Sequence, residues 1–475
     1  MKILMLSWEY PPRIVGGISR VVHDLAQAMA KKGNEVHVVT CWEQGAPEFE
    51  KDKEVFVHRV HTYQIGTMNF VDWVLQLNFS LLEKAIEISN KVQFDIIHAH
   101  DWIVAFAART LKHSYKTPLI STIHATEHGR NHGLHNDMQR YISSVEWLLT
   151  YESWKVICNS EYMKNEIRHV FQLPEDKSVV INNGVQLEKF SGVERDYDYR
   201  RNYASDYEKI IFFVGRLVQE KGVQVLLDAV PKVISKYNDV KFVIAGKGPQ
   251  SDHLRHKAES MGIAHKLYFT GYLSEENLEK LYKCSDIAVF PSLYEPFGIV
   301  ALEGMVANIP VVVTDTCGLG EIVEHGVDGM KAFTGNANSL ADCILALLFD
   351  YDLTERVKSN ALKKIHTLYN WDKISEQTIK VYEEVVLLGR QHYGTGMQGT
   401  EEMKKKSGRK KVQEQTKSAA DVKVESKKGR ASTKKDKVGL SNSNKKNTQK
   451  VSEEIVMNEL LIKSRKNRGN SSELH

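Results

Sequence analysis

The chain has 475 residues, 42% hydrophobic and 9% aromatic, which is enough for two ordinary domains with buried cores and a tail. The net charge of +4 hides an asymmetry: residues 1–399 hold 43 Lys and Arg against 50 Asp and Glu, whereas residues 400–475 hold 21 against 10. No stretch approaches the roughly 18 apolar residues of a membrane span, and the N-terminal run "ILML" is too short for the core of a signal peptide.

The cysteines favour a reducing compartment. They show no C-x-x-C pair and no zinc-site spacing, and four of them lie in or beside apolar runs. We therefore expect reduced thiols and a cytoplasmic protein. The five are Cys41, Cys158, Cys284, Cys317 and Cys343.

Short apolar runs alternate with helical patterns from the first residue. The runs are apolar on both faces, as the strands of a parallel sheet require. Between them, residues 19–32 and 161–171 have helical periodicity, with Val22 and Leu25 on one side of the first segment. The alternation predicts a doubly wound α/β domain over residues 1–190. Its expected strands are "KILMLS", "EVHVVT", "FDIIHAH", "PLISTIH", "KVICNS" and "SVVIN".

The alternation pauses over a polar, charged linker, residues 191–208, and then resumes. A second doubly wound domain is expected over residues 209–370, followed by a helix over residues 371–392. Two such sheets leave a cleft at the carboxyl ends of their strands, where open α/β sheets bind ligands. The expected strands of the second domain are "KIIFFVGR", "VKFVIAG", "KLYFTG", "DIAVFPS" and "IPVVVTD".

The composition changes again over residues 393–475. No Phe, Trp or Tyr follows Tyr393, and Lys, Ser, Asn and Gly dominate. Such a segment cannot bury enough surface to offset its chain entropy, so we expect a disordered tail. Its lysine clusters, 404–406 and 434–437 among them, are either a solvated linker or a non-specific contact for polyanions.

Two loops carry candidate groups for an anion. Gly16 and Gly17 lie between the first strand and the first helix, where backbone N–H groups and the helix dipole favour an anion, or where a tight turn needs glycine. Arg216 and Lys221 lie in the first loop of the second domain, "GRLVQEKG". Two cations in one loop suit a diphosphate whose charge grows as a bond to it breaks.

The stretch "SLYEPFGIVALEGM" brings two carboxylates to a turn between a strand and a helix. Glu295 is expected to project into the cleft, and Gly298 lets a ligand approach the backbone. Glu303 lies in an apolar run, where a charge needs a partner, and we expect it to accept hydrogen bonds from ribose hydroxyls. A pair of surface carboxylates is the alternative.

In this order and spacing the motifs resemble those of retaining nucleotide-sugar glycosyltransferases of the GT-B, family 4 type, and specifically the glycogen and starch synthases. The resemblance covers residues 1 to about 392, and it implies two Rossmann-like domains facing across a cleft, with the last helix crossing back to the first domain. Its strongest mark is E-x7-E, seen here as "EPFGIVALE". Supporting marks are "YPPRIVGG", "HAHDW", "TIHATEHGR", "NGV", "GRLVQEKG", "GKGP" and "CGLGEIVEHGVDG".

The resemblance also implies a role for each donor-side residue. Gly16 and Gly17 approach the donor phosphates, Arg216 and Lys221 hold the diphosphate, and Glu303 takes the ribose. The donor sugar is held by Glu295 and by the backbone N–H groups that follow it, those of Gly298, Ile299 and Val300.

On the other side of the cleft, the resemblance assigns His124 to the donor sugar near its 6-hydroxyl and Asp101 to the acceptor. Glu321 is a weaker candidate at the cleft edge, whereas His98 and His100 are expected to support the strand edge. The expected catalytic residues are therefore Glu295, His124, Arg216 and Lys221.

The reaction implied is the transfer of a hexose, most simply glucose, from a nucleotide diphosphate sugar to the hydroxyl of an α-1,4-glucan. We expect neither a cofactor nor a bound metal, because no D-x-D pair follows a strand and Arg216 with Lys221 can neutralise the leaving diphosphate. Two alternatives stay open at this point. One is a family 4 transferase with a lipid-linked or small-molecule acceptor, and the other is a polyanion-binding module with a degenerate transferase domain.

Overall fold

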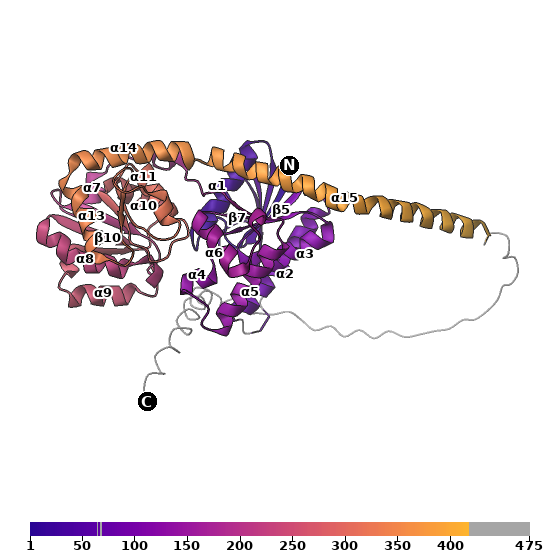
Figure 1. Cartoon of the computed structure of the whole chain (residues 1–475), viewed down its shortest axis with the longest axis horizontal. Helices are drawn as coiled ribbons and strands as arrows, with labels where there is room; N and C mark the ends of the chain where they lie inside the picture. Colours follow the sequence, from indigo (N-terminus) through magenta and orange to yellow (C-terminus); the bar gives the residue numbers. More distant parts are fainter. Residues whose placement is uncertain (64, 67–68, 418–475) are drawn as a thin grey trace, which may run out of the picture. The chain divides into compact units, whose positions relative to one another are not determined.

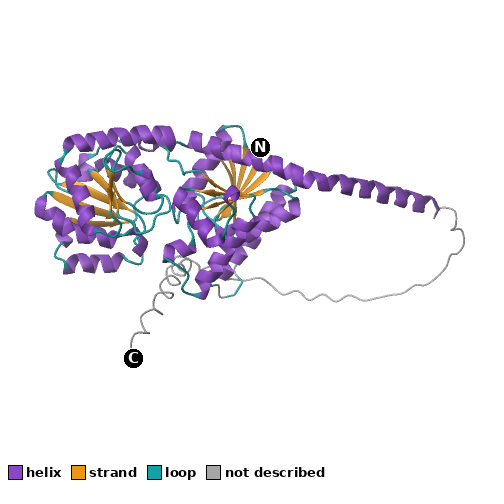
Figure 2. Ribbon diagram, in the orientation of Figure 1, coloured by secondary structure: helices purple, strands orange, loops and turns teal. Residues whose placement is uncertain are grey.

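The computed structural model describes residues 1–63, 65–66 and 69–417. One compact unit, residues 1–386, contains two β-sheets that follow each other along the chain (Figure 1). Each sheet has helices on both of its faces (Figure 2), so the predicted doubly wound α/β architecture is confirmed.

The first sheet has eight strands, and the hairpin at its edge is its one antiparallel pair. Six of the strands are those expected from apolar runs, and β1, β5 and β6 are buried over almost their whole length. The edge hairpin, β3 and β4, was not predicted, because β3 alternates exposed and half-buried residues. In spatial order the strands are β3 (Phe49–Asp52), β4 (Val55–Val60), β2 (Glu35–Cys41), β1 (Lys2–Leu6), β5 (Ile96–His100), β6 (Leu119–Ile123), β7 (Lys155–Cys158) and β8 (Ser178–Val180).

The second sheet has six strands, all parallel. Five of them match the predicted runs, and the short sixth strand at the edge was not predicted. Separate apolar cores cover its two faces, as expected for strands that are apolar on both sides. In spatial order the strands are β11 (Leu267–Gly271), β10 (Val240–Ala245), β9 (Lys209–Val214), β12 (Ile287–Phe290), β13 (Val311–Thr314) and β14 (Met330–Ala332).

The helices that surround the first sheet follow the predicted periodicity. In α1 (Gly17–Lys31) the apolar side chains of Val22, Leu25 and Met29 are buried against this sheet. The segment "TMNFVDWVLQLNFS" continues into α2, whose Val74 and Leu77 are fully buried, so from Phe70 on it is a core helix. The remaining helices of this part are α2 (Phe70–Ser89), α3 (Ala105–Tyr115), α4 (Glu127–Asn131), α5 (Asp137–Glu152) and α6 (Glu161–Phe171).

The linker between the sheets contains two short helical turns: η3 (Leu187–Phe190), just before the segment predicted to lack regular structure, and α7 (Tyr197–Arg200), within that segment. Phe190 anchors it by packing into a core of the second sheet. The helices that follow are α8 (Val223–Lys236), α9 (Ser251–Ser260), α10 (Glu275–Cys284), α11 (Ile299–Val306), α12 (Leu319–Ile322), α13 (Ala337–Phe349) and α14 (Tyr351–Leu368).

The first turns of the last helix, α15 (Trp371–Lys417), lie against the first sheet (Figure 1). Its first turns contribute Trp371, Ile374 and Tyr382 to the core that covers β1 and β2. The Tyr382 hydroxyl also lies 2.5 Å from Nδ1 of His98 on β5. The helix continues past residue 392, where the sequence placed the start of the disordered tail, and residues 418–475 of that tail lie outside the described residues.

Burial of histidines predicts that the protein loses stability in mild acid. Burial lowers the pKa of His98 to about 3, so the folded protein keeps this ring neutral while the unfolded chain protonates it below about pH 6.5. The free energy of unfolding should therefore fall as the pH drops from 6.5 towards 3, by up to about 1.4 kcal/mol per pH unit from this residue. Urea unfolding at pH 7, 6 and 5 measures the slope.

The control is His98→Asn, which cannot take up the proton. Its free energy of unfolding should start lower, because the bonds to Tyr382 and Thr122 are changed. It should then fall less steeply with pH than that of the wild type. Equal slopes in the two proteins would show that His98 does not contribute to the acid sensitivity.

Candidate active site

The carboxyl ends of the parallel strands bring most of the predicted residues to two facing strand edges. Asp101 directly follows β5 and His124 directly follows β6 in the first sheet. In the second sheet, Arg216 lies just past β9 and Glu295 lies past β12. Because parallel strands end at a common edge, each sheet collects its candidates at one place.

The Gly16–Gly17 loop is shaped by a carboxylate that the sequence analysis did not single out. Oε2 of Glu9 accepts hydrogen bonds from the backbone N–H groups of Val15 and Gly16, both at 2.8 Å. Glu9 is 1% exposed, and burial raises its pKa in spite of these two bonds. The loop amides therefore do present an anion-binding arrangement, and part of it is occupied by the protein's own carboxylate.

Gly17 begins α1 at a close contact with the second sheet's helices. A Cβ atom at this position would lie 3.4 Å from Cδ1 of Ile299, the first residue of α11. The N-termini of α1 and α11 therefore lie next to each other. The first amides of both helices have no intrahelical acceptor.

The two donor-side loops of the second sheet are joined by their backbones. The N–H groups of Leu293 and Tyr294 donate to the carbonyl oxygen of Glu220, at 2.8 and 3.3 Å. This places Nζ of Lys221 in an ion pair with Oε2 of Glu295. The charges of Lys221 and Glu295 thus compensate each other within the site.

Only glycine fits at position 298, in the turn that leads into α11. Its φ is +105°, and a Cβ atom there would lie 2.5 Å from Cδ1 of Leu319. The turn exposes the amides of Ile299 and Val300, which lie in the first turn of the helix. These are the amides that the sequence analysis expected to face a ligand.

Carboxylates from the loops of both sheets lie close enough to Arg216 for their charges to act on it. Surrounding protein lowers the pKa of Arg216, as does the charge of Arg130, while Glu220, Glu9 and Glu295 act in the opposite direction. Its side chain nevertheless keeps 48% of its surface exposed, and its nearest carboxylate oxygen, on Glu220, is 3.7 Å away. A guanidinium that is enclosed by protein but accessible to solvent is available to bind an anion.

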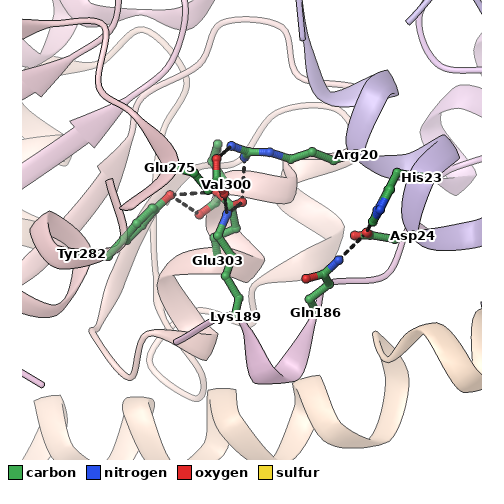
Figure 3. A network of polar contacts seen from close by, with 9 residues as sticks. All are labelled: Arg20, His23, Asp24, Gln186, Lys189, Glu275, Tyr282, Val300 and Glu303. Atoms are coloured by element: carbon green, nitrogen blue, oxygen red, sulfur yellow. Dashed lines mark hydrogen bonds and ion pairs between the residues drawn. The ribbon is translucent and has the colours of Figure 1, made fainter. Parts of the chain in front are cut away.

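Glu303, predicted to need a partner, has three (Figure 3). It is 2% exposed, and its Oε1 accepts from Nη1 of Arg20 at 2.8 Å and from Nζ of Lys189 at 2.6 Å, while Oε2 accepts from the Tyr282 hydroxyl at 3.2 Å. Burial acts to raise the pKa of Glu303, but the two cations outweigh it and the pKa is lowered. Glu303 is therefore a buried, ionised carboxylate, and the reading as a surface charge is wrong.

Asp101 and His124 lie at the strand edge of the first sheet and are joined by a hydrogen bond. The Asp101 backbone has φ +62° and ψ 173°, a conformation that is strained for a residue with a side chain. Its Oδ1 accepts from the backbone N–H of His124 at 2.7 Å. Burial lowers the pKa of His124, so its imidazole is neutral at pH 7 and can donate or accept a hydrogen bond.

His98 and His100 lie beneath this pair and are fully buried. His98 bonds to Thr122 and Tyr382, and Nδ1 of His100 lies 3.2 Å from Nε2 of His124. Both rings thus support the strand edge and the His124 side chain, which agrees with the role expected for them.

Arg130 is a site residue that the sequence analysis quoted within "TIHATEHGR" without assigning it a role. It is an exposed residue of α4. Surrounding protein acts to lower its pKa, but the charges of Asp101, Tyr294, Glu127 and Glu146 outweigh this effect and the pKa is raised. The signal that could have identified it is its position seven residues past the end of β6, in the loop region where His124 already pointed to a site.

Glu321 has a structural contact that the sequence did not indicate. Its carboxylate accepts from the backbone N–H groups of Glu161 and Tyr162 at 3.0 and 2.7 Å, and so caps the N-terminus of α6. The nearby Ser160 hydroxyl donates to the carbonyl of Pro296 at 2.8 Å. Glu321 therefore joins α12 to α6, and Ser160 joins the start of α6 to the turn before α11.

Comparison with known proteins identifies the family. Residues 15–189 match the family "Glycosyltransferase Family 4", and residues 197–364 match "Glycosyl transferases group 1". An uncharacterised glycosyltransferase of Methanocaldococcus jannaschii is 40% identical over 82% of this chain and 100% of its own length. A protein of Mycobacterium tuberculosis named glycogen synthase is 32% identical over 80% of this chain and 94% of its own.

Solved structures agree on the fold. A sucrose-phosphate synthase from Thermosynechococcus elongatus superposes with a TM-score of 0.71 at 22% identity, over 82% of this chain and 100% of the other. The HepE protein of Anabaena, in complex with UDP and glucose, superposes with a TM-score of 0.65 at 20% identity, over 81% of this chain and 99% of the other.

Two searches of the described residues gave negative results. No helix among them is both long and apolar enough to cross a bilayer. Within the same residues, no cluster of three or more His, Cys, Asp and Glu side chains is arranged to hold a metal ion.

The sequence matches, the paired α/β sheets and the E-x7-E turn agree with one another: this chain is a glycosyltransferase of family 4 with the GT-B fold.

Proposed function

We propose that the enzyme transfers a hexose, glucose in the first instance, from a nucleotide diphosphate sugar to a hydroxyl of an α-glucan, with retention of the anomeric configuration. The observation that carries the proposal is the gathering of Arg216, Lys221 and Glu295 at one strand edge, within reach of the charge of Glu9 from the other sheet. The relative named glycogen synthase supports the choice of glucose and glucan.

In this proposal the two cations bind the diphosphate. Arg216 is solvent-accessible and has no carboxylate within hydrogen-bonding distance, and Lys221 needs only to exchange Glu295 for a phosphate oxygen. The amide of Gly17, at the first position of α1, adds a neutral donor from the facing sheet. Negative charge that builds up on the leaving diphosphate is thereby stabilised.

The donor sugar would lie between the turn at Gly298 and the first sheet. Glu295, once released from Lys221, can accept from sugar hydroxyls, and the amides of Ile299 and Val300 can donate to them. The neutral imidazole of His124 approaches from the opposite edge, and Asp101 fixes its backbone. The acceptor hydroxyl is expected beside Asp101.

The bond changes need no covalent intermediate on the protein. The acceptor oxygen bonds to the anomeric carbon on the face from which the diphosphate leaves, the bond from that carbon to the phosphate oxygen breaks, and the acceptor proton passes to the departing phosphate. The residues named above orient the reactants and stabilise the developing charge. Independence from a metal or cofactor remains a prediction, as does a cytoplasmic location.

A second acceptor class has one observation in its favour. The exposed, charged Arg130 lies close enough to Asp101 for the two charges to interact, and it would suit an acceptor that bears an anionic group. A related Corynebacterium glutamicum protein is named D-inositol 3-phosphate glycosyltransferase, at 27% identity. The lipid-linked acceptor and the polyanion-binding tail have no comparable support and remain predictions.

An activity assay across donors and acceptors tests the proposed function. Release of nucleoside diphosphate should be followed for UDP-, ADP- and GDP-glucose, each with glycogen, maltooligosaccharides or a sugar phosphate as acceptor. We expect glucose transfer from at least one donor, dependent on a glucan. Transfer only to the sugar phosphate would favour the Arg130 alternative, and release with no acceptor dependence would contradict both.

Glu295→Gln should abolish most of the transfer while leaving the fold intact. The amide keeps the shape of the side chain but loses the charge that steadies the sugar, so we expect kcat to fall about 100- to 1000-fold. The melting temperature should change by no more than a few degrees, because the amide oxygen can still accept a hydrogen bond from Lys221. Glu324→Gln, which changes an exposed carboxylate between α12 and β14, should behave like the wild type.

Lys221→Met should weaken the binding of nucleoside diphosphate about tenfold or more, because a charge-assisted bond to phosphate is lost. Isothermal titration calorimetry with the preferred diphosphate measures the change. Lys221→Met also leaves Glu295 without its partner, so the double variant Lys221→Met with Glu295→Gln serves as the control. If the double variant binds as tightly as the wild type, Lys221 does not contact the diphosphate.

A further inference from the structure

The carboxylate assigned to the ribose is already occupied in the structure. Oε1 of Glu303 accepts from two cations, Arg20 and Lys189, and Oε2 accepts from Tyr282 (Figure 3). A carboxylate offers about four acceptor positions, so three are in use and one remains. A ribose diol needs two, and one of the present partners therefore has to leave before the nucleotide can bind there.

Two of the three partners are fixed in the same core as Glu303. Tyr282 is fully buried, and its ring packs edge-on against Phe190 and Phe212. The Lys189 side chain is 8% exposed and belongs to η3, which is anchored through Phe190. Neither can withdraw without opening the core of the second sheet.

Arg20 is the partner that can leave. It lies on α1, which packs on the first sheet, and its side chain is 28% exposed. Its second hydrogen bond, from Nη2 to Glu275 at 2.5 Å, is at an exposed position. Of the three partners, Arg20 is the most exposed, and its guanidinium regains water when these contacts break, which offsets part of the cost of leaving Glu303.

The charges left behind stay compensated after Arg20 withdraws. Nζ of Lys189 lies 2.6 Å from Glu303 and also 2.6 Å from Glu275, so both carboxylates keep a cation. A buried carboxylate that lost its last partner would be strongly destabilising. The network thus allows one cation to be exchanged for a ligand without loss of the fold.

Arg20 is also part of a longer contact along α1. One turn further on, Asp24 accepts from Nε2 of Gln186 at 2.5 Å (Figure 3), and at the start of the helix Gly17 lies against Ile299. Arg20 is therefore one of several contacts between α1 and the elements around α11.

We propose that Arg20 is a positioning residue. Its guanidinium occupies the Glu303 carboxylate where the ribose would bind, and the donor nucleotide displaces it from there. The contact of α1 with Glu303 and the binding of ribose are then mutually exclusive, so the free energy needed to break the contact lowers the apparent affinity for the nucleotide. The inference rests on the proposed function, which assigns Glu303 to the ribose of a nucleotide diphosphate sugar.

The test is the affinity of Arg20→Met for UDP, ADP and GDP, measured by isothermal titration calorimetry. Removal of a cation ordinarily weakens the binding of an anion, whereas the proposal predicts the opposite: binding about three- to tenfold tighter than in the wild type. The KM for the donor should fall with no increase in kcat. Arg20→Lys, which keeps the charge, should lie closer to the wild type.

Two controls separate this effect from general electrostatics. Lys32→Met removes a cation just past α1 that pairs with Glu376 at 2.8 Å, and it should leave the affinity unchanged. Inorganic pyrophosphate, which lacks ribose, should not bind more tightly to Arg20→Met than to the wild type.

The outcomes are distinct. If the wild type binds nucleoside diphosphate and Arg20→Met binds it equally or more weakly, Arg20 does not compete for Glu303, while the proposed function stands. Equal tightening for pyrophosphate also overturns the proposal, since the effect would not involve the ribose. If none of the proteins binds any of the three diphosphates, the proposed function itself fails, and this inference with it.

Discussion

A carboxylate that is almost wholly removed from water determines how the two halves of this enzyme meet. Glu303 lies in an apolar helix and stays ionised because Lys189 and Arg20 surround it. One of these cations comes from the linker and the other from the first sheet's helix α1. Compensation of a single buried charge thereby brings α1 into contact with α11, and the glycine loop that precedes α1 lies near the E-x7-E turn.

The same logic runs through the rest of the site, where groups suited to a ligand are paired with one another. Lys221 pairs with Glu295, and the amides of Val15 and Gly16 bond to Glu9. A diphosphate sugar carries anionic oxygens and hydroxyls that can replace the internal partners in each case. Binding then exchanges one set of polar contacts for another, so the protein keeps a charged cleft in order at little cost in folding stability.

Much of this architecture could be predicted from local patterns. Runs that are apolar on both faces gave the buried strands, and a glycine at the turn after "EP" marked Gly298, where a Cβ atom has no room. The pairings that complete the site have no local signal. Arg20 and Glu303 are 283 residues apart, and in the sequence Arg20 looks like any residue on the polar side of α1. The cap of α6 by Glu321 and the hydrogen bonds that the loop amides donate to the Glu9 carboxylate could not be predicted, for the same reason.

The return of α15 to the first sheet has a consequence for biosynthesis. Trp371, Ile374 and Tyr382 fill part of the apolar layer over the earliest strands, and the Tyr382 hydroxyl meets a histidine on β5. A nascent polypeptide that has left the ribosome only as far as the linker exposes that layer to water. Its N-terminal half reaches its final packing when the segment around residue 386 has been synthesised, although the second sheet can already have formed by then.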